Sequence, residues 1–202
     1  MTMPWGLILF GVGLLLLGTT GVAMASSIER ANAAGYVEAD PSSIAAAHGV
    51  SLNVEALARM MVSEVGSKEA AQIAVGWAAR NMASKRGESI SKLLLRSKGV
   101  ADGHFGWQKT GGRYASTRLP STPASRALAT KVLAGSIKDP TGGAVQFDAP
   151  EAQDKLVASG EAGYNKTAAE VAASRAADGK VAVMVPGVST VRFWVPTGGK
   201  VA

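Results

Sequence analysis

The chain has 202 residues, enough for one domain of ordinary size together with a tail or a membrane anchor. It has no cysteine, which excludes disulfides, thiolate catalysis and thiolate metal sites, and its two histidines, His48 and His104, offer little material for a metal centre or a Ser-His-Asp triad. The net charge is +6, with a local excess in residues 84–131, where ten Lys or Arg stand against Glu88 and Asp102.

This basic segment has two interpretations. It is either a solvated face without a partner or a surface for a polyanion, such as nucleic acid, an anionic membrane or the acidic polymers of a bacterial envelope. Each histidine is expected to be a surface residue or a hydrogen-bonded structural residue.

The N-terminal stretch, residues 3–25, contains no charged side chain, and its length matches the roughly 20 residues that span a bilayer as a helix. Trp5 suits the interfacial belt at one end. The alternative is a cleaved secretory signal, because "AMA" at 23–25 fits the small-residue pattern before a cleavage site; we favour an anchor because no Lys or Arg precedes the apolar stretch. The sequence thus predicts a transmembrane helix in 1–27, with lipid contact through 4–24, and an Ala/Ser-rich tether, 28–51, interrupted at Pro41.

The first predicted helix of the globular part ends in a carboxylate. Leu57, Met60 and Met61 share one stripe at i, i+3 and i+4, and Glu64 occupies i+7 of the same apolar stripe. Gly66 is the expected stop signal, which puts Glu64 in the last turn, where the helix dipole disfavours negative charge. Both effects are expected to raise the pKa of Glu64. A carboxyl group that stays protonated near neutral pH can donate a proton to a leaving group.

The second predicted helix runs to about Ser84. Asn53 is the expected N-cap of the first helix and Ser67 that of the second, with Glu69 in its first turn. Its packing stripe ends in the amide Asn81, which is either a structural bracket between elements or a site residue. The other members of that stripe are Ala70, Ala74, Trp77 and Ala78.

A short helix in 89–96 precedes a glycine-rich stretch that gathers aromatic and hydrogen-bonding side chains. Such groups on a loop are typical of sites that stack on sugar rings or bases, although each aromatic could equally pack the loop down. They are Phe105, Trp107, Gln108, Lys109, Arg113 and Tyr114.

The remaining elements alternate helices with little strand. Pro123 and Gly135 bracket a helix; "KDPTGG" reads as a turn into a strand in 144–147; helices follow in 151–159 and 167–177; and a terminal hairpin turns at Pro186-Gly187. The predicted fold class is mainly α, of the α+β kind, with a small β element, preceded by one N-terminal transmembrane helix.

Two motifs resemble one family. "EVGSKEAAQIAVGWAARN" followed some sixty residues later by "DPTGGAVQF" is similar to the SleB-like cell wall hydrolases, lytic transglycosylases of the lysozyme-like superfamily found in spores, bacterial envelopes and bacteriophages. The similarity covers about 54–150 and implies a lysozyme-like domain in 52–202, with a C-terminal extension from about 151. The chain departs from the family at Gly66-Ser67, where Gly-Glu is frequent, at Asn81-Met82, where Asn-Arg is frequent, and in the central "FGWQ".

The resemblance implies the chemistry. Glu64, at the position of the family's catalytic glutamate, would protonate the glycosidic oxygen between N-acetylmuramic acid and N-acetylglucosamine; the acetamido group would stabilise C1, and Glu64 would then take the C6 hydroxyl proton to give a 1,6-anhydro product. No metal or organic cofactor is implied. Asp139 also has a plain role as a turn-forming side chain. The expected substrate-binding residues are Gln72, Asn81, Phe105, Gln108, Tyr114, Asp139, Thr141, Gly142, Gly143 and Phe147.

Three functions follow, in order of preference. The first is a membrane-tethered enzyme that cleaves peptidoglycan glycan strands, facing the periplasm and cell wall or carried by a virion. The second is a non-enzymatic lysozyme-like structural or peptidoglycan-binding protein of a virion or envelope. The third is nucleic-acid binding through residues 84–131, which predicts salt-sensitive retention on DNA and is the least favoured.

Overall fold

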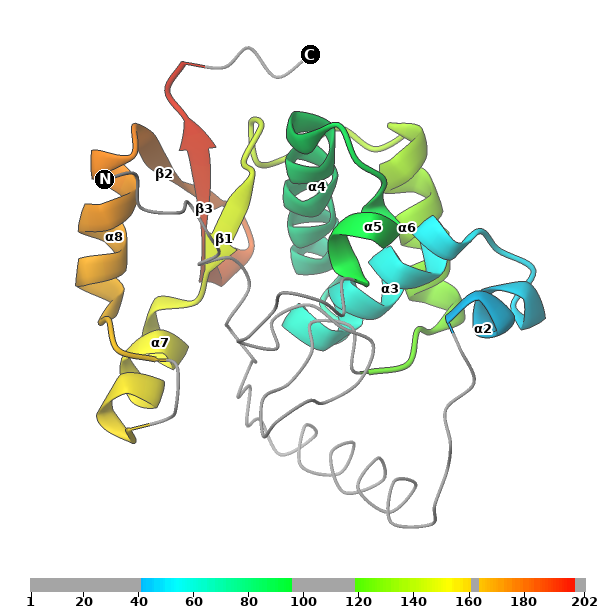
Figure 1. Ribbon diagram of the computed structural model, residues 1–202, viewed down its shortest axis with the longest axis horizontal. Helices are drawn as coiled ribbons and strands as arrows, with labels where there is room; N and C mark the ends of the chain where they lie inside the picture. The colour runs from blue at the N-terminus through cyan, green and yellow to red at the C-terminus, as the bar shows by residue number, and fades with distance from the viewer. Residues whose placement is uncertain (1–40, 96–118, 161–163, 199–202) are drawn as a thin grey trace, which may run out of the picture.

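The computed structural model describes residues 41–95, 119–160 and 164–198 (Figure 1). The predicted anchor, 1–27, and most of the tether lie outside these ranges, and within them no helix is both long and apolar enough to cross a bilayer. The elements in chain order are α2 (Pro41–Ala47), α3 (Leu52–Val65), α4 (Glu69–Arg86), α5 (Ile90–Leu94), α6 (Pro123–Ala134), β1 (Gln146–Asp148), α7 (Pro150–Ala158), α8 (Ala168–Ala177), β2 (Lys180–Val185) and β3 (Val188–Pro196). The described part is therefore of the predicted α+β kind.

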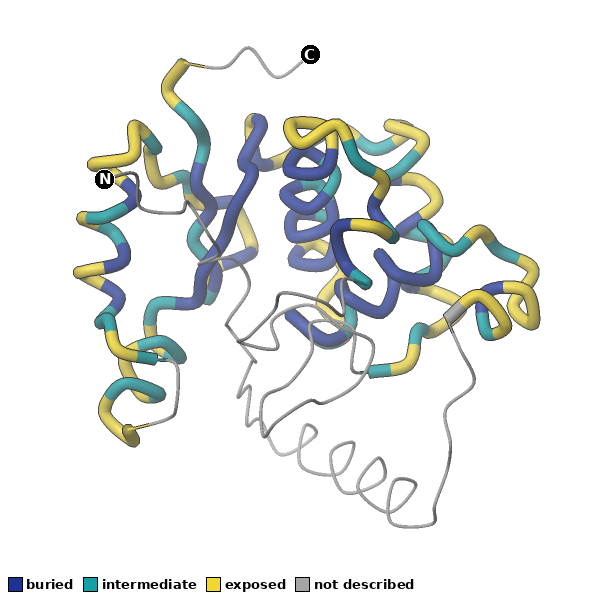
Figure 2. The backbone as a smooth tube through the Cα atoms, in the orientation of Figure 1, coloured by how far each residue is buried: buried dark blue, intermediate teal, exposed yellow. Residues whose placement is uncertain are grey.

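Helix α3 is the centre of the helical part and packs against α2, α4, α5 and α6. The predicted apolar stripe is confirmed, because Leu57, Met60 and Met61 are fully buried. Helix α4 is rich in small residues, which lets it approach α3 closely: a Cβ added at Gly76 would lie 3.3 Å from the sulfur of Met61. Figure 2 shows the resulting buried core along both helices.

The packing stripe of α4 was predicted correctly except at its start. Ala74 and Ala78 are fully buried and Trp77 is half-buried, but Ala70 is exposed. Ala70 lies in the first turn of α4, where Ala71 and Gln72 are buried in its place. Arg80, nearly one turn beyond Trp77, lies over the Trp77 ring at 4.4 Å and donates to the carbonyl of Val132, so that it ties α4 to α6.

Pro41 begins α2, consistent with the fixed φ of proline in a first turn. Two predicted helix starts differ from the structure. The N-cap of α3 is Ser51, whose hydroxyl accepts from the amide of Val54, whereas Asn53 accepts from the amide of Ser91 and so joins α3 to α5. The N-cap of α4 is Lys68, not Ser67.

The three-stranded antiparallel sheet has the order β1-β3-β2, and its β2–β3 hairpin turns at the predicted Pro186-Gly187, where Gly187 has φ 76°. Its two faces differ in chemistry because side chains alternate along a strand. Phe147 and Phe193 are paired across β1 and β3, with ring centroids 6.1 Å apart, and belong to the same buried core as α3 and α4.

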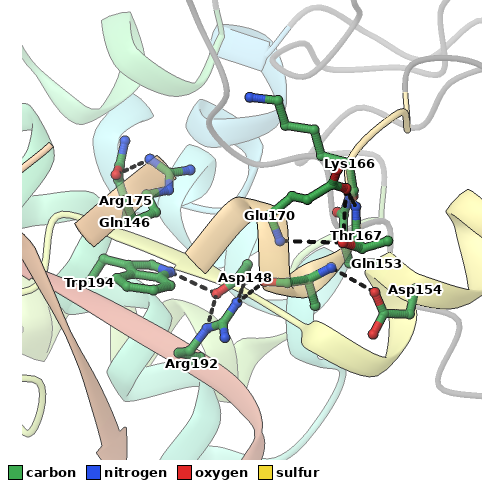
Figure 3. Close-up of polar contacts among 11 residues, drawn as sticks. Gln146, Asp148, Gln153, Asp154, Lys166, Thr167, Glu170, Arg175, Arg192 and Trp194 are labelled. Carbon is green, nitrogen blue, oxygen red and sulfur yellow. Dashed lines mark hydrogen bonds and ion pairs between the residues drawn. The ribbon is translucent and has the colours of Figure 1, made fainter. Parts of the chain in front are cut away.

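The opposite face of the sheet carries a buried polar network (Figure 3). Asp148 accepts from Arg192 Nε at 3.1 Å and from Trp194 Nε1 at 2.8 Å, and Arg192 Nη2 also donates to the carbonyl of Ala168 at the start of α8. Arg175 of α8 donates to Gln146 of β1. Burial lowers the pKa of the Arg175 guanidinium, and the nearby charge of Asp148 opposes that shift. The network attaches α8 to the sheet.

Helix α8 begins with a capping box that makes its stability depend on pH. Glu170 Oε2 accepts from the Thr167 amide at 2.7 Å and from the Thr167 hydroxyl at 2.9 Å, and these bonds lower the pKa of Glu170 from its ordinary value of 4.5. A lowered pKa means that the charged form stabilises the fold above pH 4.5 and that this contribution is lost as the pH falls through the lowered value.

We expect Glu170→Gln to remove that part of the acid sensitivity. Thermal unfolding between pH 7 and pH 3 should show a smaller decrease in Tm for the variant than for the wild-type protein, because glutamine cannot be protonated in this range. Equal decreases in the two proteins would show that the capping carboxylate does not contribute.

Candidate functional site

Glu64 lies in the last turn of α3 and is buried, with 3% of its surface exposed. It shares its stripe with the fully buried Leu57, Met60 and Met61, as predicted. A carboxyl group withdrawn from water is disfavoured in its charged form. The predicted setting for a proton donor, an acid on the apolar side of a helix end, is therefore present.

The turn that carries Glu64 is held from two sides. Helix α3 ends at Gly66, whose φ of 64° and ψ of −138° are accessible to glycine alone among ordinary residues, and whose amide donates to Val62 O at 2.9 Å. Gln72 of α4 donates through Nε2 to the carbonyl of Gly66. On the other side the Ser63 hydroxyl accepts from the amide of Leu119 at 2.9 Å.

Gly66 and Gly87 both end helices, and we expect substitution by asparagine to destabilise the protein more at Gly66 than at Gly87. Gly87 ends α4 in the left-handed helical region, with φ 62° and ψ 35°, and a Cβ would meet nothing within 4 Å at Gly66 or at Gly87. Asparagine tolerates the left-handed helical region, so Gly87→Asn should lower the free energy of unfolding by less than about 1 kcal/mol, whereas Gly66→Asn should lower it by about 1–3 kcal/mol. Urea unfolding of both variants checks this; equal losses would contradict it.

The predicted "DPTGGA" turn is organised by the carboxylate of Asp139. Its Oδ1 accepts from the amide of Thr141 at 2.8 Å and the Thr141 hydroxyl at 2.6 Å, and its Oδ2 accepts from the amide of Gly143 at 3.0 Å. Asn81 Nδ2 donates to Asp139 Oδ2 at 2.9 Å and to the carbonyl of Ala144 at 3.1 Å. Asn81 is thus the structural bracket, one of the two roles left open by the sequence, and Asp139 takes its turn-forming role.

This turn does not meet Glu64. Gln72 marks the level of the Glu64 turn on α4, and Asn81, nine residues later, marks the level of the "DPTGGA" turn, so the two levels are separated by about 14 Å at 1.5 Å per residue. Figure 1 shows the end of α3 and the loop before β1 at opposite ends of α4. Gly142 and Gly143 therefore lie toward the opposite end of α4 from the Glu64 turn, and their role in substrate binding stays a prediction.

The other predicted site residues differ in how far they are buried. Gln72, Thr141 and Phe147 are 4%, 0% and 4% exposed, which leaves them little area to offer a ligand, whereas Gly142 is exposed. Phe147 belongs to the core shared by α4 and the sheet. Phe105, Gln108 and Tyr114, like His104, lie outside the described residues.

A buried polar stripe that was not predicted from the sequence lies on the face of α3 opposite Glu64. Glu55 is fully buried: its Oε2 lies 3.0 Å from His48 Nδ1, and its Oε1 accepts from the Ser121 hydroxyl at 2.8 Å, which in turn accepts from Arg126 at 2.7 Å. His48 is thereby confirmed as a hydrogen-bonded structural residue. Arg59, 1% exposed, and Ser63 continue the stripe. The i, i+4 spacing of Glu55 and Arg59 was the available signal.

The described residues include no group of three or more His, Asp or Glu side chains placed to hold a metal ion. Comparisons of the chain with protein-family models, with curated proteins and with solved structures gave no match. The function is therefore inferred from the residues of this chain alone.

Proposed function

We propose that the protein is a peptidoglycan-degrading enzyme of the lytic transglycosylase type with a lysozyme-like fold, in which Glu64 is the general acid and base. The single observation that carries the proposal is the burial of Glu64 at the end of a core helix, on a stripe of fully buried apolar side chains. Burial among apolar side chains disfavours the charged form of a carboxyl group, which suits a group that has to donate a proton near neutral pH.

The proposed reaction needs one carboxyl group. Glu64 in its protonated form donates to the glycosidic oxygen between N-acetylmuramic acid and N-acetylglucosamine, and the bond from C1 to that oxygen breaks. The substrate's acetamido group stabilises C1. The Glu64 carboxylate then removes the proton of the C6 hydroxyl, whose oxygen bonds to C1 to form the 1,6-anhydro ring, and Glu64 is again protonated.

Among the described residues, three other buried or half-buried acids have structural duties, which is consistent with this one-acid scheme. Glu55 is bonded to His48 and Ser121, Asp139 organises its turn, and Asp148 is paired with Arg192. A two-carboxylate mechanism would need a second acid near the scissile bond. None of these three is placed for that role.

The charge and the N-terminus suggest where the enzyme acts. Lys85, Arg86, Lys92 and Lys131 are exposed and would favour contact with an anionic wall polymer, in addition to their favourable position near helix ends. The apolar stretch 1–27 would anchor the protein in a lipid membrane facing the periplasm and cell wall, or in a virion.

Incubation of the purified protein with peptidoglycan, followed by mass analysis of the soluble products, tests the proposal. We expect muropeptides that are lighter than their hydrolysed counterparts by one water, about 18 mass units, because the anhydro ring forms without addition of water. Products carrying a reducing end would indicate hydrolysis. Binding to peptidoglycan without any release would favour the non-enzymatic alternative.

A further inference from the structure

Gln72 is a buried amide in the second turn of α4, on the side that meets the end of α3. It is 4% exposed, and the neighbouring Ala71 and Ala74 are 3% and 0% exposed. Its Nε2 donates to the carbonyl oxygen of Gly66, two residues after Glu64. The amide thus links the first turns of α4 to the residue at which α3 stops.

We infer that Gln72 is a positioning residue for Glu64, an inference that rests on the proposed function. The last carbonyls of a helix have no partner within it, and the unusual backbone of Gly66 sets the direction of the chain directly after the Glu64 turn. A donor from α4 fixes the Gly66 peptide plane against the rigid second helix. The Glu64 carboxyl group is thereby held at one place relative to α4, and catalysis is sensitive to displacements of about 1 Å.

The alternative role for Gln72 is a direct contact with substrate, and the burial of its side chain disfavours that role. The side chain has little exposed surface, and its amide nitrogen already donates to Gly66. The two roles differ in kinetics. Loss of positioning lowers kcat and leaves KM nearly unchanged, whereas loss of a substrate contact made equally in the ground and transition states raises KM.

The test uses two substitutions of similar size. Gln72→Met keeps the length of the side chain and removes the donor, and we expect kcat to fall by about 10- to 100-fold with KM within about twofold of the wild-type value. Gln72→Glu can donate to Gly66 only while its carboxyl is protonated, so its residual activity should increase toward acid pH relative to the wild-type profile. A purely structural role would lower the amount of folded protein without changing the shape of the pH profile.

Gln153→Met is the matched control. Gln153 of α7 also donates through Nε2 to a backbone carbonyl, that of Lys166, but belongs to the C-terminal part of the chain. Its loss should leave kcat, KM and the pH profile unchanged. Circular dichroism and Tm at each pH identify any variant that fails to fold; if Gln72→Met does not fold, the pH profile of Gln72→Glu decides.

Three results would overturn the inference. Wild-type kcat and pH profile in both Gln72 variants would show that the bond has no positioning role, and a raised KM with unchanged kcat would assign Gln72 to the substrate instead. If the wild-type protein itself releases no more product than a Glu64→Gln variant, the proposed function fails and this inference fails with it. The first two results leave the proposed function intact, so the failures are distinguishable.

Discussion

Glu64→Gln is expected to abolish release of anhydro-muropeptides while the protein stays folded. Glutamine has the shape of a protonated glutamate but cannot give up or accept the proton in either step, and general acid–base catalysis contributes about 10²- to 10⁴-fold to a rate. Because Glu64 would serve both steps, the loss should reach at least the upper part of that range. The measurement is product release from purified peptidoglycan, quantified by mass spectrometry.

Two further measurements make the Glu64 experiment specific. Glutamine keeps the volume of the glutamate side chain, so Tm should stay close to the wild-type value. Glu69→Gln is the matched control, since Glu69 is an exposed glutamate in the first turn of α4, and it should keep its activity. Retained activity in Glu64→Gln would end the assignment of Glu64 as the general acid and base.

Asp139→Ala is expected to produce the largest loss of stability among single changes in the "DPTGGA" turn. The change removes the acceptor of four hydrogen bonds and leaves the buried side chains of Asn81 and Thr141 short of partners. The free energy of unfolding should fall by about 3 kcal/mol, since each unsatisfied buried polar group costs about 1–3 kcal/mol. Urea unfolding measures it.

Asp154→Ala is the comparison for the Asp139 experiment. Asp154 is exposed and accepts one bond, from the amide of Ala168 at 2.6 Å, so its removal should lower the free energy of unfolding by about 1 kcal/mol. If Asp139 only organises its turn, the fraction of Asp139→Ala that remains folded should retain wild-type kcat. A folded Asp139→Ala protein without activity would instead give Asp139 a part in the reaction.

Local patterns in the sequence predicted most helices and the hairpin, because each has its own signals. The apolar stripe of α3, the stop at Gly66, the Pro123–Gly135 bracket and the turn at Pro186-Gly187 are all present in the structure. Cap positions were less predictable: Ser51 and Asn53 are both good N-cap residues, and Asn53 is used by α5 instead. That choice depends on a neighbour 38 positions away.

The burial of Glu64 at the end of α3 was predictable from the sequence, whereas the arrangement of the other candidate residues around it was not. Glu64 could be recognised because its environment is set by the stripe of its own helix. Gln72, Asn81 and Asp139 share motifs with it in sequence, but the course of α4 puts the Asn81–Asp139 pair at the other end of the helix. The buried Glu55 and its contact with His48 were missed because a charged side chain on a helix usually meets solvent.

The sheet has a consequence for any attempt to shorten the protein. The resemblance predicted from the two sequence motifs ends near residue 150, just after β1, yet the neighbour of β1 is β3, about forty residues further on, and Phe193 of that strand belongs to the same interior as Met61. A truncation at 150 would strip the central strand, open the interior to water and leave the edge of β1 free to aggregate. The smallest unit that folds independently should reach Pro196.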